Sequence, residues 1–108
     1  ISLGLVGSEM CIRDRVRAYK GRRPMAVGTG SEHSVAVGLL QHLGLLSYFD
    51  AIVAADDVKR HKPEPDTFLR CAELIGVTPA RCVVFEDADY GLQAACAAGM
   101  DAVDVRRL

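Results

Sequence analysis

The chain has 108 residues, of which 50% are hydrophobic and 25% are charged, and its formal net charge at pH 7 is −1. This composition is typical of one small globular domain and excludes a disordered chain. The balanced charge provides no general attraction for nucleic acid or a membrane surface, and no apolar run approaches the roughly 20 residues of a membrane helix. We therefore expect neither a nucleic-acid partner nor a membrane partner.

The four cysteines form no C-x-x-C pair, which argues against a zinc knuckle. Three of them, Cys71, Cys82 and Cys96, fall within predicted helices or strands among small aliphatic residues, so we expect buried thiols. Unpaired thiols are typical of a reducing compartment, and we expect a cytoplasmic protein.

Residues 1–15 differ in kind from the rest of the chain. Residues 1–12 lack the basic start and the continuous apolar run of a signal peptide. The stretch from Leu5 to Arg15 instead resembles the translated end of a transposon adapter used in DNA sequencing libraries. We expect residues 1–15 to be a non-native tail and residues 16–108 to form the domain; a natural strand-like or disordered N-terminus is the alternative.

Four short apolar runs bounded by turn residues predict strands. They are Met25–Gly28, Ala51–Ala54, Cys82–Phe85 and Ala102–Val103. A predicted helix separates each run from the next, so strand and helix alternate three times. Alternation of this kind predicts an α/β fold with βαβ units, right-handed crossovers and a mostly parallel sheet.

The three predicted helices share a stop signal, a glycine followed by an apolar residue. The stops are Leu43-Gly44-Leu45, Ile75-Gly76-Val77 and Ala98-Gly99-Met100. Helical periodicity predicts which side chains of each helix face inward. They are Val35, Leu39 and Leu43, with Ala36 and Leu40 beside them, in the helix over 31–43; Phe68, Leu69, Ala72 and Ile75 in the helix that carries Pro65 in its first turn; and Leu92, Ala95 and Cys96 in the last helix.

Polar residues follow the first predicted strand and precede the second helix. In parallel sheets, ligands bind outside the carboxyl ends of the strands. Thr29, Gly30 and Ser31 combine a hydroxyl group with backbone N–H groups at a helix start, which is typical of an anion site; a simple helix cap by Thr29 or Ser31 is the alternative. Lys62, restricted by the proline that follows it, can place a positive charge on a phosphate; an ordinary surface lysine is the alternative. We expect His33 and His61 to be surface residues or local caps.

Carboxylates follow the third predicted strand. Glu86 and Asp87 provide hard oxygen ligands, which suit Mg²⁺. The alternative is that these acids complement the start of the next helix, with Asp89 as its cap. That alternative leaves Glu86 and Asp87 unexplained, because adjacent carboxylates repel each other unless a cation is near. The three clusters together predict a phosphate site beside a metal site.

In these motifs the sequence resembles the haloacid dehalogenase superfamily, in its β-phosphoglucomutase-like subgroup, and within it the bacterial fructose-1-phosphate/6-phosphogluconate phosphatases. The matching segments are Ala26–Ser31, Lys62–Phe68 and Val84–Gly91, followed by Ala94-Ala95 and Ala98-Gly99. The resemblance covers about residues 16–108. It implies a three-layer Rossmann-like core and a Mg²⁺-dependent, monomeric phosphatase that hydrolyses small phosphorylated metabolites through an aspartyl-phosphate.

The resemblance also implies roles for individual residues. Thr29 would hold a phosphoryl oxygen together with the neighbouring amides of Gly30 and Ser31, and Lys62 would neutralise the phosphate and orient the nucleophile. Asp87 would bind Mg²⁺ directly, and Glu86 would bind it directly or through water. Gly91 would allow the following helix to pack close to the strand.

The sequence departs from the family at its start. The family's nucleophile is the first aspartate of a D-x-D motif on a first strand, whereas Asp14 is the only aspartate before Thr29 and lies in the suspect tail. The cap domain that follows this strand is also missing. We therefore expect a C-terminal fragment of a phosphatase, inactive alone, with exposed sheet edges where the first strand would lie between the strands ending at Gly28 and Phe85.

Other functions stay open at this point. A phosphosugar mutase of the same subgroup and a non-catalytic, anion-binding α/β module are the alternatives. A dehalogenase needs no Mg²⁺ and would not require Glu86 and Asp87. A response-regulator receiver has its acids early in the chain, whereas here they come last.

Overall fold

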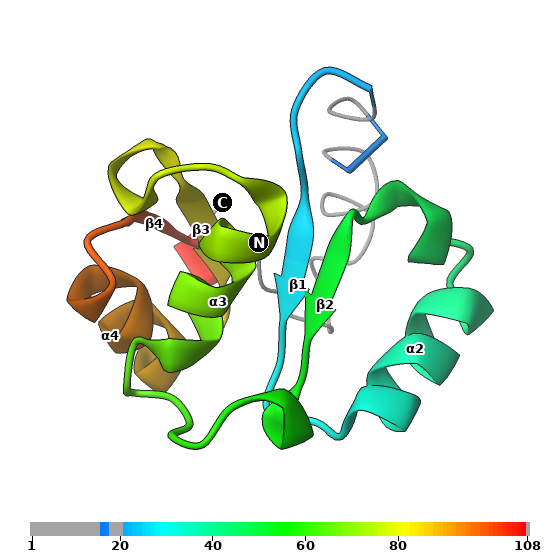
Figure 1. Ribbon diagram of the computed structural model, residues 1–108, viewed down its shortest axis with the longest axis horizontal. Helices are drawn as coiled ribbons and strands as arrows, with labels where there is room; N and C mark the ends of the chain where they lie inside the picture. Colours follow the sequence, from blue (N-terminus) through cyan, green and yellow to red (C-terminus); the bar gives the residue numbers. More distant parts are fainter. Residues whose placement is uncertain (1–15, 18–20, 108) are drawn as a thin grey trace.

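The computed structural model describes residues 16–17 and 21–107, so the expected non-native tail, with Cys11 in it, lies outside the described residues. Strands and helices alternate along the chain (Figure 1). The strands are β1 (Ala26–Gly28), β2 (Ala51–Val53), β3 (Val83–Glu86) and β4 (Asp101–Asp104). The helices are α2 (His33–His42), α3 (Asp66–Ile75) and α4 (Asp89–Ala97). The predicted α/β alternation is confirmed, and each strand lies within one residue of its predicted bounds.

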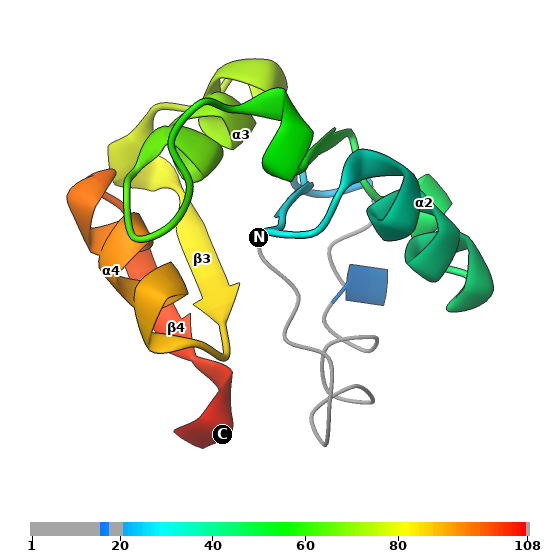
Figure 2. The same cartoon turned by 90° about the horizontal axis from the view of Figure 1, so that it is seen from below.

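The strands form two parallel pairs. β1 pairs with β2, with Ala26 opposite Ala51, and β3 pairs with β4, with Glu86 opposite Asp104. Among the described residues these pairs are two separate two-stranded sheets. Figures 1 and 2 show α2 and α4 at opposite ends of the molecule, with α3 between them. The result is the expected α/β fold as a partial core.

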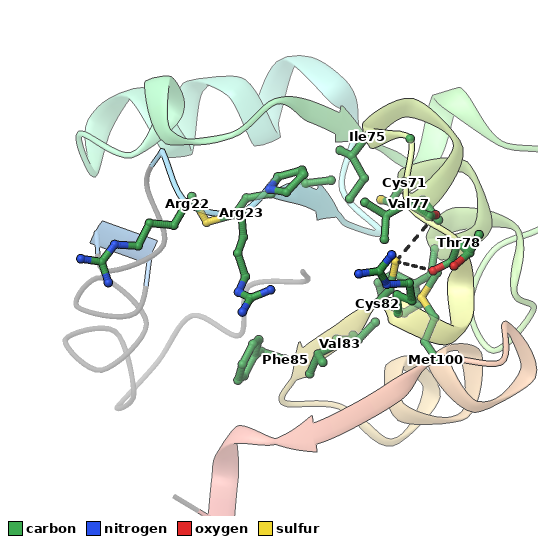
Figure 3. A pocket seen from close by; sticks show the side chains of 18 residues that line it. Arg22, Arg23, Cys71, Ile75, Val77, Thr78, Cys82, Val83, Phe85 and Met100 are labelled. Carbon is green, nitrogen blue, oxygen red and sulfur yellow. Dashed lines mark hydrogen bonds between the residues drawn. The ribbon is translucent and has the colours of Figure 1, made fainter.

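A cavity of about 620 Å³ lies between the two strand pairs (Figure 3). Its lining comes from α3, from the start of β1 and from β3, and it includes three arginines. The principal lining residues are Met25, Ala26, Phe68, Cys71, Ala72, Val83, Val84 and Phe85, with Arg22, Arg23 and Arg81. In the part of the chain that the structure describes, the two strand pairs are thus separated at the place where the family resemblance implies a further strand.

The three glycine stops act as predicted. Gly44, Gly76 and Gly99 adopt φ values of 71°, 71° and 76°, a conformation that costs glycine little because it has no Cβ. The apolar residue after each glycine donates its N–H to a carbonyl five residues earlier. These bonds are Leu45 N to Leu40 O at 2.9 Å, Val77 N to Ala72 O at 3.1 Å and Met100 N to Ala95 O at 3.0 Å.

Three predicted side-chain orientations are wrong. In α2, Ala36 and Leu40 are buried, whereas Val35 and Leu39 are 56% and 37% exposed. The helix contains two overlapping series of apolar residues spaced by four, and periodicity alone does not tell which one packs inward. Leu69 of α3 is also exposed, and Thr67 and Cys71 are buried in addition to the predicted Phe68 and Ala72.

The thiols differ in burial. Cys71 is buried and Cys82 is half-buried, but Cys96 of α4 is exposed, so the prediction of a buried thiol is wrong there. In α4 the buried positions are instead Gly91, Ala94 and Ala95, because the helix packs on the strands through its smallest residues. No helix among the described residues is long and apolar enough to cross a bilayer.

Candidate functional site

Lys62 joins the carboxyl ends of β1 and β3. Its ammonium group donates to Gly28 O at 3.2 Å and to Glu86 Oε2 at 2.9 Å, and it lies 4.8 Å from the centroid of the Phe68 ring. Only 17% of the Lys62 side chain and 4% of the Glu86 side chain are exposed. The alternative of an ordinary surface lysine is therefore wrong: the charge is held at a fixed place in the fold.

The segment Thr29–Ser31 forms the turn directly after β1. Its backbone is tied to β2 by Thr29 N, which donates to Val53 O at 2.9 Å, and Ser31 N donates to Thr29 Oγ1 at 3.2 Å. The Thr29 hydroxyl group can still donate its own hydrogen, since it uses only an acceptor position in this bond. A hydroxyl donor thus stands one residue from the carbonyl group that Lys62 contacts.

Neither Thr29 nor Ser31 caps α2. The helix begins at His33 and makes no side-chain cap bond from its own N-cap residue, Glu32. Its first N–H group, that of His33, donates instead to Asp56 Oδ1 at 2.8 Å. The helix-cap alternative for Thr29 and Ser31 is therefore wrong, and the cap comes from a loop that the local sequence did not indicate.

Glu86 and Asp87 differ sharply in environment. Glu86 is 3% exposed and its two oxygens accept from Lys62 and, at 3.0 Å, from Asp87 N, whereas Asp87 is half-buried. Gly91 is essential to this placement, because a Cβ at that position would overlap the Glu86 carboxyl group. The geometry agrees with the close packing that the resemblance implied for Gly91. Glu86 is turned toward Lys62, and Asp87 is the more accessible carboxylate.

Asp89 does not cap α4, contrary to the alternative considered for it. It is the first residue of that helix, and its carboxylate accepts from Arg106 Nη2 at 2.8 Å. Arg106 also bonds both oxygens of Asp104 and lowers the pKa of Asp104 to about 2. No local pattern in the sequence indicated Arg106, because its pairing with Asp89 depends on how β4 ends beside α4.

The predicted site residues lie around one end of the two strand pairs. Lys62 contacts the residue before Thr29 and the residue before Asp87, so the hydroxyl, the ammonium and the carboxylates share that end. Within the described ranges, no three His, Cys, Asp or Glu side chains are grouped as a metal site. Two carboxylates nevertheless fit Mg²⁺ chemically, because this ion takes oxygen ligands, often one or two carboxylates completed by water or phosphate. The cavity of Figure 3 is separate, since none of these residues lines it.

This fold and this arrangement of groups define the class of the protein: the chain belongs to the haloacid dehalogenase-like hydrolase family, whose sequence profile matches residues 12–99. Over 95 residues it is 70% identical to the fructose-1-phosphate phosphatase YqaB of Escherichia coli (strain K12), covering 88% of this chain and 50% of that protein. It is 36% identical over 93 residues to the phosphorylated carbohydrates phosphatase of Thermotoga maritima, covering 85% of this chain and 43% of that protein.

A solved structure shares the fold. The crystal structure of β-phosphoglucomutase from Clostridium difficile superimposes with a TM-score of 0.80 at 32% identity, covering 86% of this chain and 41% of that one. The chain therefore spans about half the length, or less, of these relatives. The predicted family and fold class are confirmed.

Proposed function

We propose that residues 16–108 are the phosphate-binding and metal-binding part of a Mg²⁺-dependent phosphatase that acts on small sugar-phosphate monoesters, preceded by a non-native tail. The contact that carries this proposal is the Lys62 ammonium between Gly28 O and Glu86 Oε2, because it holds one cation between the strand end before Thr29 and the strand end before Asp87. The relatives that hydrolyse phosphorylated carbohydrates support the same substrate class.

The phosphate side of the site uses the positive charge and the donors. In this proposal Lys62 neutralises a phosphoryl oxygen, the Thr29 hydroxyl donates to another, and the backbone of Gly30 and Ser31 completes the cradle. Fixed donors of this kind stabilise charge that develops in a phosphoryl-transfer transition state. Lys62 is suited to this work because Glu86 and Gly28 already fix its position.

The metal side of the site uses the carboxylates. Asp87 would hold Mg²⁺, and Glu86 would bind it directly or through water while it orients Lys62 and the Asp87 backbone. When bound, the ion would supply positive charge to the phosphoryl oxygens. Asp87 suits direct binding better than Glu86, since Asp87 is half-buried whereas Glu86 is only 3% exposed.

The nucleophile is proposed to be an aspartate of a D-x-D motif in a segment outside the 108 residues. These residues contain no such motif before Thr29. We therefore expect no hydrolysis of p-nitrophenyl phosphate by this chain with Mg²⁺. Turnover above that of an Asp87→Ala control would contradict this expectation.

Binding tests the remaining half of the proposal. In a titration of ¹⁵N-labelled chain with MgCl₂ and inorganic phosphate, the amide signals of Gly30, Ser31 and Asp87 should shift, and Asp87→Asn should abolish the Mg²⁺-dependent part. The matched control is Asp101→Asn, which removes an exposed carboxylate at the other end of the strands. Equal effects of the two variants, or no shift at these amides in the unaltered chain, would refute the proposed site.

A phosphosugar mutase is the second candidate, since the matched Clostridium difficile structure is a β-phosphoglucomutase. The groups described above bind phosphate and metal in either case. Assay of the full-length protein with a hexose 1-phosphate separates the two: a mutase yields the 6-phosphate isomer, and a phosphatase releases inorganic phosphate.

A further inference from the structure

We propose that the short turn Ala55–Asp57 is a positioning element, which sets the distance between the Thr29–Ser31 loop and Lys62. The turn is hydrogen-bonded to His33 on one side and to His61 on the other. The turn is a single 3₁₀ turn that follows β2. This inference rests on the proposed function, because the spacing it controls matters only if the loop and the lysine bind the same phosphate.

Each residue of the turn forms a hydrogen bond with the Thr29–Ser31 loop or with His33, the first residue of α2. Ala55 N donates to Ser31 O at 2.9 Å, His33 N donates to Asp56 Oδ1 at 2.8 Å, and His33 Nδ1 donates to Asp57 Oδ2 at 3.0 Å. Helix capping explains only the bond to Asp56. The other two bonds tie the turn to the loop itself and to the side chain that begins α2.

The same turn is also hydrogen-bonded to the segment that carries Lys62. His61 Nε2 donates to Ala55 O at 2.8 Å, and His61 immediately precedes Lys62. Ala55 therefore connects the two loops, because its N–H group bonds Ser31 and its carbonyl group bonds His61. Hydrogen bonds thus connect the Thr29–Ser31 loop, through Ala55, to His61, the residue before Lys62.

The turn is also bonded to a buried residue directly after β2. Asp57 Oδ2 also accepts from Ala54 N at 2.8 Å, and Ala54 is fully buried at the end of β2. The Ala54 N–H group and the His33 side chain together lower the pKa of Asp57. The Asp57 carboxylate therefore stays charged at neutral pH. It links the His33 side chain to the backbone of Ala54, which is fully buried.

The need for such an element follows from the chain path. Thr29 and Lys62 lie on different loops, separated in sequence by α2 and β2. The bond from Lys62 Nζ to Gly28 O joins the two loops at the end of a long side chain, whereas the turn also restrains their backbones. Phosphate binding by fixed groups is sensitive to small displacements, and a shift of about 1 Å in a positioned group can be costly. A turn bonded to both loops supplies that restraint.

Paired substitutions test this role, because each histidine has a variant that keeps the relevant donor. Asn can replace the Nδ1 donor of His33, and Gln can replace the Nε2 donor of His61. We expect His33→Ala and His61→Ala to weaken binding of inorganic phosphate in the presence of Mg²⁺ by about 2- to 10-fold, the effect of one hydrogen bond. His33→Asn and His61→Gln should bind within about twofold of the unaltered chain, by the same measure.

Hydrogen exchange separates positioning from general stability. The Ala55 amide should exchange faster in both alanine variants, while the urea midpoint of unfolding should fall by less than about 0.5 M, because the hydrogen bonds of His33 and His61 are exposed. His42→Ala is the matched control: His42 is the exposed last residue of α2, and no described contact joins it to the turn.

The outcomes are distinct. If the unaltered chain shows no phosphate binding, the proposed function fails and this inference fails with it. If it binds phosphate and the alanine variants bind equally well, the positioning role alone is wrong. Faster exchange at Ala55 with unchanged affinity also overturns it, since the turn would then be structural without bearing on the site.

Discussion

Loss of the Lys62 ammonium should destabilise the fold strongly, apart from any effect on binding. The substitution Lys62→Met keeps an unbranched apolar side chain but removes the ammonium group, which lies over the Phe68 ring and contacts Glu86. Glu86 is 3% exposed, so water cannot readily replace the lost contact. The expected consequence is a buried carboxylate that has lost its ion pair with Lys62.

The size of the effect follows from these contacts. Removing one member of a buried ion pair costs about 3–5 kcal/mol. Lys62 is partly reached by water and Glu86 keeps its bond from Asp87 N, so the lower end of the range, about 3 kcal/mol, applies here. With a urea slope of about 2 kcal/mol per molar, the unfolding midpoint should fall by roughly 1.5 M.

Urea unfolding followed by circular dichroism measures this shift. The double variant Lys62→Met, Glu86→Leu should recover much of the loss, because an apolar pair of similar volume carries no desolvated charge. The matched control is Arg70→Met, which breaks the exposed pair of Arg70 with Glu73 and should cost less than about 1 kcal/mol. A loss for Lys62→Met as small as that control, or no recovery in the double variant, would refute the reasoning.

Three further predictions concern single residues. Gly91→Ala should lower the free energy of unfolding by about 1–3 kcal/mol in the same urea assay, because the new Cβ overlaps the Glu86 carboxyl group. The pKa of Asp104 is lowered from 3.8 to about 2, so its stabilisation is complete above pH 4 and is lost as the pH falls through about 2; Asp104→Asn should therefore flatten the acid dependence of stability in that interval. Burial raises the pKa of the Cys71 thiol, so mass spectrometry after iodoacetamide treatment should find Cys96 alkylated before Cys71, which should react only after unfolding.

Each of these predictions has a control within the chain. Gly38→Ala should be neutral or stabilising, since an added Cβ on this exposed face of α2 meets open space and alanine favours helix. Asp101→Asn is the matched control for the loss of a carboxylate on the same strand as Asp104. A loss at Gly38 equal to that at Gly91, an unaltered acid profile in Asp104→Asn, or equal alkylation rates of the two thiols would contradict the respective argument.

Much of the fold could be predicted from the sequence because its signals are local. The stops at Gly44, Gly76 and Gly99 depend on bonds within six residues, and the structure has all three. The four apolar runs were placed to within one residue by the turns that bound them. The order of hydroxyl, lysine and carboxylates at successive strand ends also indicated a shared site, because the carboxyl ends of parallel strands lie together.

Only the tertiary structure decided which side chains work together. Ala36 and Leu40 pack inward rather than Val35 and Leu39, because a helix with two overlapping apolar series takes its orientation from its neighbours. The cap of α2 by Asp56 and the contact of Lys62 with Glu86 join residues more than 20 positions apart. Local chemistry specifies where helices and strands begin and end. Contacts between residues far apart in the sequence form only when these elements pack together. Such contacts determine which groups surround each charged side chain.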